Sequence, residues 1–171
     1  SQGNLILSKF PITKSDITFF NVPHGERRED ERDCYLMTPR NLQHCTIDTN
    51  GTELNIFNTQ GVWGEDGDDN DRRLAMGKTI VDSIQGYKNV ILCGDFNVQE
   101  KTQTMDLIDK HLTNIFKGEL KTTFNMQQKT FPGFATAVVD MIFTSPNIKV
   151  INKSCPQVNI TDHLPLLATF E

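Results

Sequence analysis

Residues 90–97 read Val90-Ile91-Leu92-Cys93-Gly94-Asp95-Phe96-Asn97, an apolar run that continues directly into a short polar motif. A continuous apolar run is typical of a strand that is covered on both faces of a sheet. Rigid strands often present functional groups at their ends, where the following loop begins. We therefore expect a central buried strand with Asp95 and Asn97 at its end.

Two further motifs combine a carboxylate with an apolar run. They are Val138-Val139-Asp140-Met141-Ile142-Phe143 and Thr161-Asp162-His163-Leu164-Pro165. One such carboxylate could be an accident of surface composition. Three of them, together with a histidine and an amide, form a set suited to metal-assisted attack on phosphorus. The motifs indicate a phosphoesterase-type domain.

The composition is that of one mildly acidic domain. The chain has 171 residues, 37% of them hydrophobic, which is enough for one sizeable core, and we expect a single domain over residues 1–171. Its 17 Lys and Arg residues against 22 Asp and Glu residues give a formal net charge of -5. The global basic field that favours nonspecific duplex binding is absent. Nucleic acid is therefore allowed as a substrate but not required.

The cysteine spacing and the hydropathy point to a soluble protein with free thiols. Cys34, Cys45, Cys93 and Cys155 form no CxxC pair, so we expect four free thiols, with a disulfide among the three outside the apolar run left open. No apolar stretch approaches the ~20 residues that span a bilayer, and no basic segment leads into a signal-like core. A cytoplasmic location is favoured.

Strand and helix patterns alternate along the chain. Residues 5–7 predict a short buried strand within 4–12, and Asn50-Gly51 predicts a tight turn between two strands. Asp69 or Asn70 is expected to cap a helix that ends near Gly86. Further strands are expected at 17–22, 41–48, 53–59, 90–93, 137–143 and 166–170, a charged loop at 23–33, and a second helix within 102–112. This alternation indicates a layered α/β sandwich.

Five segments, in order and spacing, resemble the endonuclease/exonuclease/phosphatase superfamily. They are residues 3–12 (GNLILSKFPI), 57–60 (FNTQ), 94–97 (GDFN), 139–143 (VDMIF) and 161–165 (TDHLP). The resemblance implies a deoxyribonuclease-like α/β fold, a four-layer sandwich of two packed mixed sheets flanked by helices. It also implies metal-dependent hydrolysis of a phosphate ester, whether in nucleic acid, an inositol phosphate or a phospholipid head group.

The resemblance assigns a role to each motif residue. Asp95 would orient or deprotonate the attacking water, and Asn97 would donate its amide to a phosphate oxygen. His163 would stabilise the same charge as an imidazolium, while Asp140 would hold its ring and keep it charged. Asp162 is a hard oxygen ligand suited to Mg²⁺ or Mn²⁺. For each residue alone, a purely structural role in a turn, a strand end or the core is an open alternative.

Three other residues are candidates for substrate binding. Asn58 and Gln60 lie in the 57–60 motif, and Trp63 could stack on a base or sugar or simply pack in its loop. Many family members carry a histidine where this chain has Gln60. Gln60 can donate a hydrogen bond but cannot transfer a proton at neutral pH. His24, His44 and His111 are interpreted as surface or structural residues.

The first residues depart from the family pattern. Family members run to about 250 residues and begin with an asparagine-bearing strand and a strand that ends in a metal-binding glutamate. We find neither pattern here and expect an N-terminally incomplete fold, the C-terminal two-thirds of a catalytic domain, unless a partner chain completes the sheet. A noncatalytic domain that binds a phosphate ligand or a partner is the alternative. The enzyme is favoured because an Asp140–His163 pair is costly to keep for packing alone.

Overall fold

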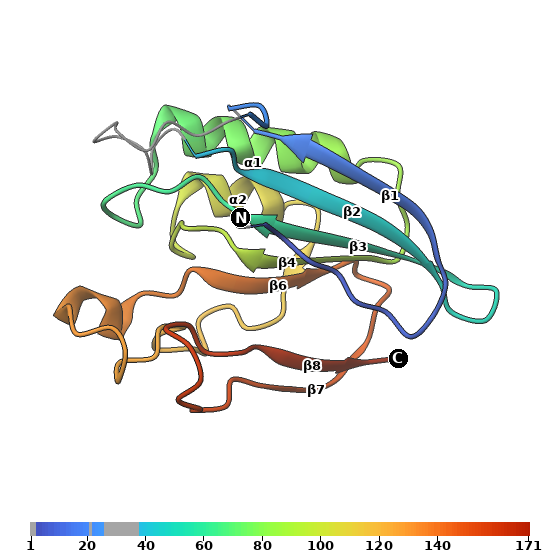
Figure 1. The fold of residues 1–171 in the computed structure, drawn as a ribbon. Helices are drawn as coiled ribbons and strands as arrows, with labels where there is room; N and C mark the ends of the chain where they lie inside the picture. Colours follow the sequence, from blue (N-terminus) through green and yellow to red (C-terminus); the bar gives the residue numbers. More distant parts are fainter. Residues whose placement is uncertain (1–2, 21, 26–37) are drawn as a thin grey trace.

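The computed structural model describes residues 3–20, 22–25 and 38–171 of the chain (Figure 1). Most of the charged loop expected at 23–33 lies outside the described residues, and so does Cys34. The other three cysteines, Cys45, Cys93 and Cys155, are free thiols, as expected.

A mixed sheet forms the centre of the molecule. Within the described part of the chain it has six strands in the order β1-β2-β3-β4-β6-β5. Strands β3 and β4 are parallel and the other neighbouring pairs are antiparallel. The strands are β1 (Ile12–Phe19), β2 (Asn41–Asp48), β3 (Glu53–Gln60), β4 (Val90–Asp95), β5 (Thr113–Asn114) and β6 (Asp140–Thr144).

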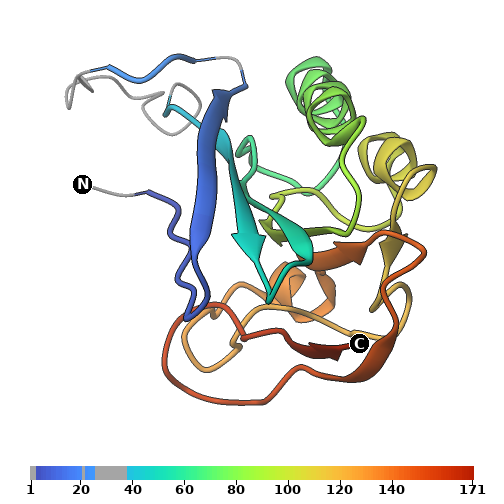
Figure 2. The same cartoon turned by 90° about the vertical axis from the view of Figure 1, so that its right-hand side faces the viewer.

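Two helices cover one face of this sheet, and a second sheet covers the other (Figure 2). The helices are α1 (Asp71–Ile84) and α2 (Gln103–Asp109), and the second sheet pairs β7 (Val150–Ser154) with β8 (Leu167–Phe170). In the described ranges, neither helix has the length and apolar character needed to cross a membrane. Packed sheets with helices outside confirm the layered α/β fold class.

Strand β4 shows why residues 90–93 are apolar without interruption. Val90 and Leu92 belong to the core beneath the helices, whereas Ile91 and Cys93 belong to the core between the two sheets. Successive side chains of a strand point to opposite faces, so a strand that is buried on both faces needs apolar residues at every position.

Several elements confirm the sequence predictions. Asn50 and Gly51 both have positive φ, 59° and 90°, in the turn between β2 and β3. The Asn70 side chain caps α1 by accepting a hydrogen bond from the backbone N–H of Arg73, at 3.0 Å. Strands β5 and β7 and the short 3₁₀ helix η1 (Pro132–Thr136) were not predicted, and strand β6 begins at Asp140 rather than at residue 137.

The prediction of a buried strand at residues 5–7 was wrong. Leu5 and Leu7 are 70% and 84% exposed, and the first strand begins at Ile12. Side chains hold this segment in place of a backbone ladder: the Asn58 amide donates to the Leu5 carbonyl, and the Asn4 amide donates to the Asn58 carbonyl, each at 3.3 Å. Of the strand expected at 17–22, residues 17–19 are the last three of β1, which lies at the edge of the sheet and ends at Phe19.

Gly94 makes the close approach of β3 and β4 possible. Its φ is 137°, and a Cβ atom there would lie 2.0 Å from the carbonyl oxygen of Thr59. We expect Gly94→Ala to lower the free energy of unfolding by about 3 kcal/mol or more, because both the backbone strain and the clash are imposed on the central strand. Urea unfolding measures this change. Gly3→Ala, where nothing lies within 4 Å, should be neutral, and equal midpoints for the two variants would contradict the argument.

Candidate active site

A cavity of about 550 Å³ opens where β4 ends and β6 begins. Its walls come from the end of β3 and the loop after it, the turn after β4, residues 124–139, and residues 162–163. Six residues singled out from the sequence line it: Gln60, Trp63, Asp95, Asn97, Asp162 and His163. Folding thus gathers in one cavity side chains that lie up to 103 positions apart in the chain.

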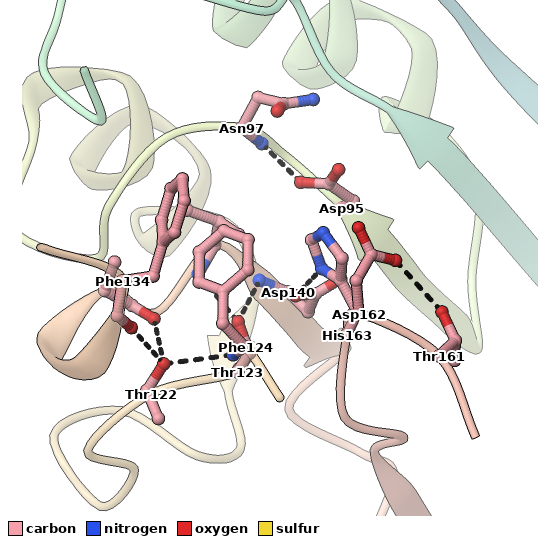
Figure 3. Close-up of polar contacts among 12 residues, drawn as sticks. Asp95, Asn97, Thr122, Thr123, Phe124, Phe134, Asp140, Thr161, Asp162 and His163 are labelled. Atoms are coloured by element: carbon pink, nitrogen blue, oxygen red, sulfur yellow. Dashed lines mark hydrogen bonds and ion pairs between the residues drawn. The ribbon is translucent and has the colours of Figure 1, made fainter. Parts of the chain in front are cut away.

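The register between β4 and β6 places the two central carboxylates side by side. Asp95 and Asp140 are directly opposite each other in this antiparallel pair. His163 Nδ1 lies 2.8 Å from Asp140 Oδ2, and the imidazole ring lies between the two aspartates (Figure 3). Asp140 does not line the cavity itself but supports His163 from behind. Asp140 therefore contacts the ring that the resemblance expects it to hold.

Thr123 locks the start of β6 beside His163. Its hydroxyl oxygen accepts hydrogen bonds from the backbone N–H groups of Val139, at 3.1 Å, and Asp140, at 3.2 Å. Its carbonyl oxygen accepts one from Leu164, at 2.8 Å. Since one buried residue binds both segments, Asp140 and His163 are held at a fixed separation.

The turn after β4 fixes Asn97 and the Asp95 carboxylate together. Asn97 has a φ of 55°, and its backbone N–H donates to Asp95 Oδ1 at 2.8 Å (Figure 3). Its side-chain amide donates to the Gly61 carbonyl at 3.1 Å. Asn is one of the few residues with a side chain that commonly adopts this left-handed conformation. One Asp95 oxygen is thus occupied by the turn.

The environment of Asp95 raises its pKa above that of an ordinary aspartate. Burial raises the pKa of Asp95 to about 6, and repulsion by Asp140 adds to the rise. Attraction to His163 and Arg40 and the hydrogen bond from Asn97 act in the opposite direction. A carboxylate with a pKa near 6 is ionised at neutral pH and remains a better proton acceptor than an ordinary aspartate.

His163 is biased toward the charged form. Burial by itself would lower its pKa, but the hydrogen bond with Asp140 and the attraction of Asp140, Asp95 and Asp162 outweigh burial, so the pKa is raised. The imidazolium therefore persists to higher pH than in an ordinary histidine. Phe124 packs against the ring, with centroids 4.5 Å apart.

Asp162 is half exposed and ionised. Its carboxylate pairs with Lys129 Nζ at 2.9 Å, and this bond holds the pKa of Asp162 below its usual range. The backbone around it is fixed by Asn125, whose N–H donates to the Asp162 carbonyl and whose amide donates to the Thr161 carbonyl.

The donor set fits a divalent cation only in part. Among the described residues no group of three or more His, Cys, Asp or Glu side chains is arranged to hold a metal. Asp162 nevertheless offers a hard carboxylate oxygen at the cavity wall. Mg²⁺ is often bound through one or two carboxylates plus substrate phosphates. The Asp162 carboxylate therefore suits a cation that a phosphate ligand also binds.

Asn58 is the one predicted site residue that lies outside both the cavity wall and its supporting contacts. Its amide donates to Leu5, as described above, and Asn58 does not line the cavity. Gln60, two positions further along β3, does line it. The strand ends at Gln60, so only its last side chains reach the cavity.

Other residues of the site were missed in the sequence. Arg40, just before β2, and Lys129 line the cavity, together with three aromatic residues, Phe124, Phe131 and Phe134. Their segments carry no motif that resembles the family pattern quoted above. The pair Thr122-Thr123 beside Phe124 was the available signal, because threonine hydroxyl groups often hydrogen-bond to nearby backbone groups in segments outside helices and strands.

Arg73 organises the loop that carries Trp63. Its guanidinium is fully buried and donates to the carbonyl groups of Val62, Asp66 and Asp68 and to the Asp66 carboxylate. Gly64 fits only because it lacks a side chain: a Cβ would lie 2.8 Å from the guanidinium. One cation in α1 thus shapes the wall formed by residues 63–67.

The sequence profile of the Endonuclease/Exonuclease/phosphatase family matches residues 1–163. No curated protein is significantly similar to the chain in sequence.

Solved structures share the fold. A functionally unknown conserved protein from Enterococcus faecalis V583 has a TM-score of 0.71 at 20% identity, over 95% of this chain and 67% of that chain. A Bacteroides thetaiotaomicron mannosyl-6-phosphatase has a TM-score of 0.69 at 21% identity, over 95% of this chain and 67% of that chain. D. rerio TDP2 complexed with a single-strand DNA product has a TM-score of 0.69 at 15% identity, over 94% of this chain and 68% of that chain. The present chain spans about two thirds of these structures, and the likeness confirms the deoxyribonuclease-like fold class.

The raised pKa of Asp95 predicts a stabilising substitution. Because its pKa is about 6 in the folded state and 3.8 as the ordinary value, the unfolded chain ionises first, and the free energy of unfolding falls as pH rises from about 4 to 6. Asp95→Asn removes this loss. We expect the variant to be about 1–3 kcal/mol more stable than the wild type at pH 7.5 and nearly equal at pH 4.

Urea unfolding at the two pH values measures the effect. Asp162→Asn is the matched control, because the pKa of Asp162 is lowered and its ionised form is favoured. That variant should gain no stability at pH 7.5. A destabilised Asp95→Asn protein at pH 7.5 would contradict the electrostatic description of the site.

Proposed function

The chain belongs to the endonuclease/exonuclease/phosphatase family, and we propose that it hydrolyses phosphate esters with an activated water in a reaction that requires a divalent metal ion. The observation that carries the proposal is the 2.8 Å contact between His163 and Asp140 at the wall of the cavity that also holds Asp95 and Asn97. Desolvation makes a partly buried charged pair of this kind costly, so such pairs are more often found at functional sites than in packing alone. A cleft with perturbed ionisable groups is a typical catalytic site.

Asp95 is the proposed general base. With a pKa of about 6 it is ionised at neutral pH, and its pKa lies close to the operating pH, where general-base catalysis is most effective. One carboxylate oxygen is held by the Asn97 N–H. The other oxygen would accept the proton of a water molecule as the water oxygen attacks phosphorus and the ester P–O bond breaks. The leaving oxygen would take its proton from solvent water.

His163 and Asn97 would stabilise the charge that develops on the phosphoryl group. The second ring nitrogen of the His163 imidazolium and the amide of Asn97 are the proposed donors to the phosphoryl oxygens. Asp140 keeps the ring oriented and charged. Gln60 lines the same cavity and can add a neutral hydrogen bond, but it cannot protonate a leaving group.

Mg²⁺ or Mn²⁺ is the proposed cofactor. Asp162 would contribute one carboxylate oxygen, and phosphate oxygens of the substrate would contribute others. When bound, the cation would neutralise phosphate charge as a Lewis acid. Metal affinity should therefore be weak in the absence of a phosphate ligand, which titration calorimetry with Mg²⁺ alone and with added inorganic phosphate can measure.

The substrate is proposed at the level of a phosphorylated compound. The structural neighbours include a mannosyl-6-phosphatase, a TDP2 protein with a single-strand DNA product and a human Nocturnin catalytic domain with a bound sulfate anion. One fold therefore serves proteins of different substrate class, and the choice among them depends on the residues around the cavity.

Single substitutions test the catalytic assignment. In the protein as its gene encodes it, assayed with Mg²⁺ or Mn²⁺, we expect Asp95→Ala and His163→Ala to lower kcat/KM for a phosphodiester by roughly 10²–10⁴-fold, as loss of a general base or a charge-stabilising donor does. Chelation of the metal by EDTA should abolish turnover. The control is His111→Ala, since His111 is exposed and does not line the cavity.

The noncatalytic alternative makes the opposite prediction. A domain that only binds a phosphorylated ligand or a partner would show tight binding and no turnover with any divalent metal. Full activity in both substituted proteins would also refute the proposed mechanism. The alternative is motivated by Gln60, which lines the cavity but cannot transfer a proton.

The pH dependence of kcat/KM tests the role of Asp140. The rate should rise through about pH 6 as Asp95 ionises and fall at higher pH as His163 loses its proton. Asp140 raises the pKa of both groups. Asp140→Asn should therefore move both limbs to lower pH. A uniform loss of rate with unmoved limbs would show that Asp140 acts only through folding.

A further inference from the structure

A row of aromatic rings begins at His163 and runs outward along one wall of the cavity. Phe124 packs on His163 and Phe134 packs on Phe124, with ring centroids 4.5 Å apart in each pair (Figure 3). Phe131 follows, 5.5 Å from Phe134 in an edge-on arrangement. Phe124, Phe134 and Phe131 all line the cavity. The aromatic surface of the wall is therefore in direct contact with the charged groups of the site.

Burial does not explain the outer rings. Phe131 is 66% exposed and Phe134 only partly buried, although the chain has buried cores on both faces of the main sheet. A phenylalanine ring in water forfeits most of the free energy that its burial would supply. An exposed aromatic surface beside a functional cavity is typical of a ligand-binding surface.

The local structure holds these rings in place. The short helix η1 follows Phe131 directly and contains Phe134. The Thr122 hydroxyl lies within hydrogen-bond distance of the carbonyl groups of Phe134, at 2.5 Å, and Ala137, at 3.0 Å (Figure 3). At Gly133 a Cβ would lie 2.7 Å from the Phe131 ring, so a glycine lets that ring fold over the turn. The aromatic wall is preorganised rather than a loose loop tip.

The charges around the wall indicate a ligand with few phosphates. Lys129 Nζ lies 5.9 Å and 5.4 Å from the ring centroids of Phe124 and Phe134 and is paired with Asp162. Among the described residues of the cavity wall, the cations Arg40 and Lys129 are outnumbered by the carboxyl groups of Glu65, Asp66, Asp95 and Asp162. A channel that follows a long polyphosphate backbone is instead lined by one sign of charge.

We propose, on the premise of the function proposed above, that the wall formed by Phe124, Phe131 and Phe134 is a base-stacking surface and that the substrate is an ester of a nucleotide. The scissile phosphate would lie at His163 and Asp95, and the adjacent nucleobase would stack on Phe134 and Phe131. A nucleobase offers a flat π surface to such rings, whereas an inositol ring offers only hydroxyl and C–H groups. The base must be unpaired, because a base inside a duplex is stacked on its neighbours and its π faces are not accessible to an aromatic side chain.

The test compares two substrates that differ only in the base. One is a short single-stranded oligonucleotide, and the other carries an abasic tetrahydrofuran residue next to the scissile phosphate. With the protein as its gene encodes it, we expect kcat/KM to be about 5- to 100-fold higher for the base-bearing substrate, the range that one stacked base contributes. Phe131→Ala should remove most of this preference, and Phe131→Trp should restore it.

The control is Leu167→Ala, because Leu167 is also a large exposed apolar residue but lies on β8, outside the cavity wall. It should keep the wild-type preference. Equal kcat/KM for the two oligonucleotides in the wild type would overturn the inference, as would faster turnover of an inositol phosphate. In either case the enzyme would still be a phosphoesterase.

A binding measurement separates this inference from the proposed function. If no substrate is turned over with any metal, the proposed hydrolysis fails, but stacking can still be observed with an oligonucleotide that carries 2-aminopurine. Its fluorescence should be quenched on binding to the wild type, and this quenching should be lost in Phe131→Ala. Unchanged quenching in Phe131→Ala, or none in the wild type, would overturn the aromatic wall as a base-stacking surface.

Discussion

The antiparallel register between β4 and β6 is the constraint on which the site depends. It places Asp95 and Asp140 directly opposite each other, and two adjacent carboxylates in a half-buried position repel each other. The His163 ring relieves this repulsion from a segment 23 residues after Asp140. Because Thr123 binds both the start of β6 and the residue after His163, the charges stay at separations that raise the pKa of both Asp95 and His163.

This arrangement lowers the stability of the folded protein at neutral pH. An Asp95 with a pKa of about 6 is a carboxylate that the folded protein ionises at a cost. The cost is tolerated because the sheet around it is rigid: β4 is buried between helices on one face and a second sheet on the other. A general base with this pKa would be hard to build on an exposed loop, where solvent would return it to its ordinary value.

Two separate loops form most of the remaining cavity wall. The buried guanidinium of Arg73 holds Val62, Asp66 and Asp68, and residues 124–137 present the aromatic wall through Thr122 and a 3₁₀ turn. Solved structures at 15–21% identity share the fold. Loops vary more than the strands and helices that they connect, so the two loops are where this cavity can differ from that of another protein with the same sheet.

The sequence by itself determined the central strand, the β2–β3 turn at Asn50-Gly51, the Asn70 cap and the polar motifs that supply Asp95, Asn97, Asp140, Asp162 and His163, because each rests on a local pattern or a short motif. It failed at Leu5–Leu7, where side-chain amides replace a ladder. Only the tertiary structure decided which charged groups face one another. It also decided that Asn58 lies outside the cavity, whereas Lys129 and the aromatic wall line it. Strand register, loop packing and pKa shifts arise from contacts between distant segments, and no local pattern encodes them.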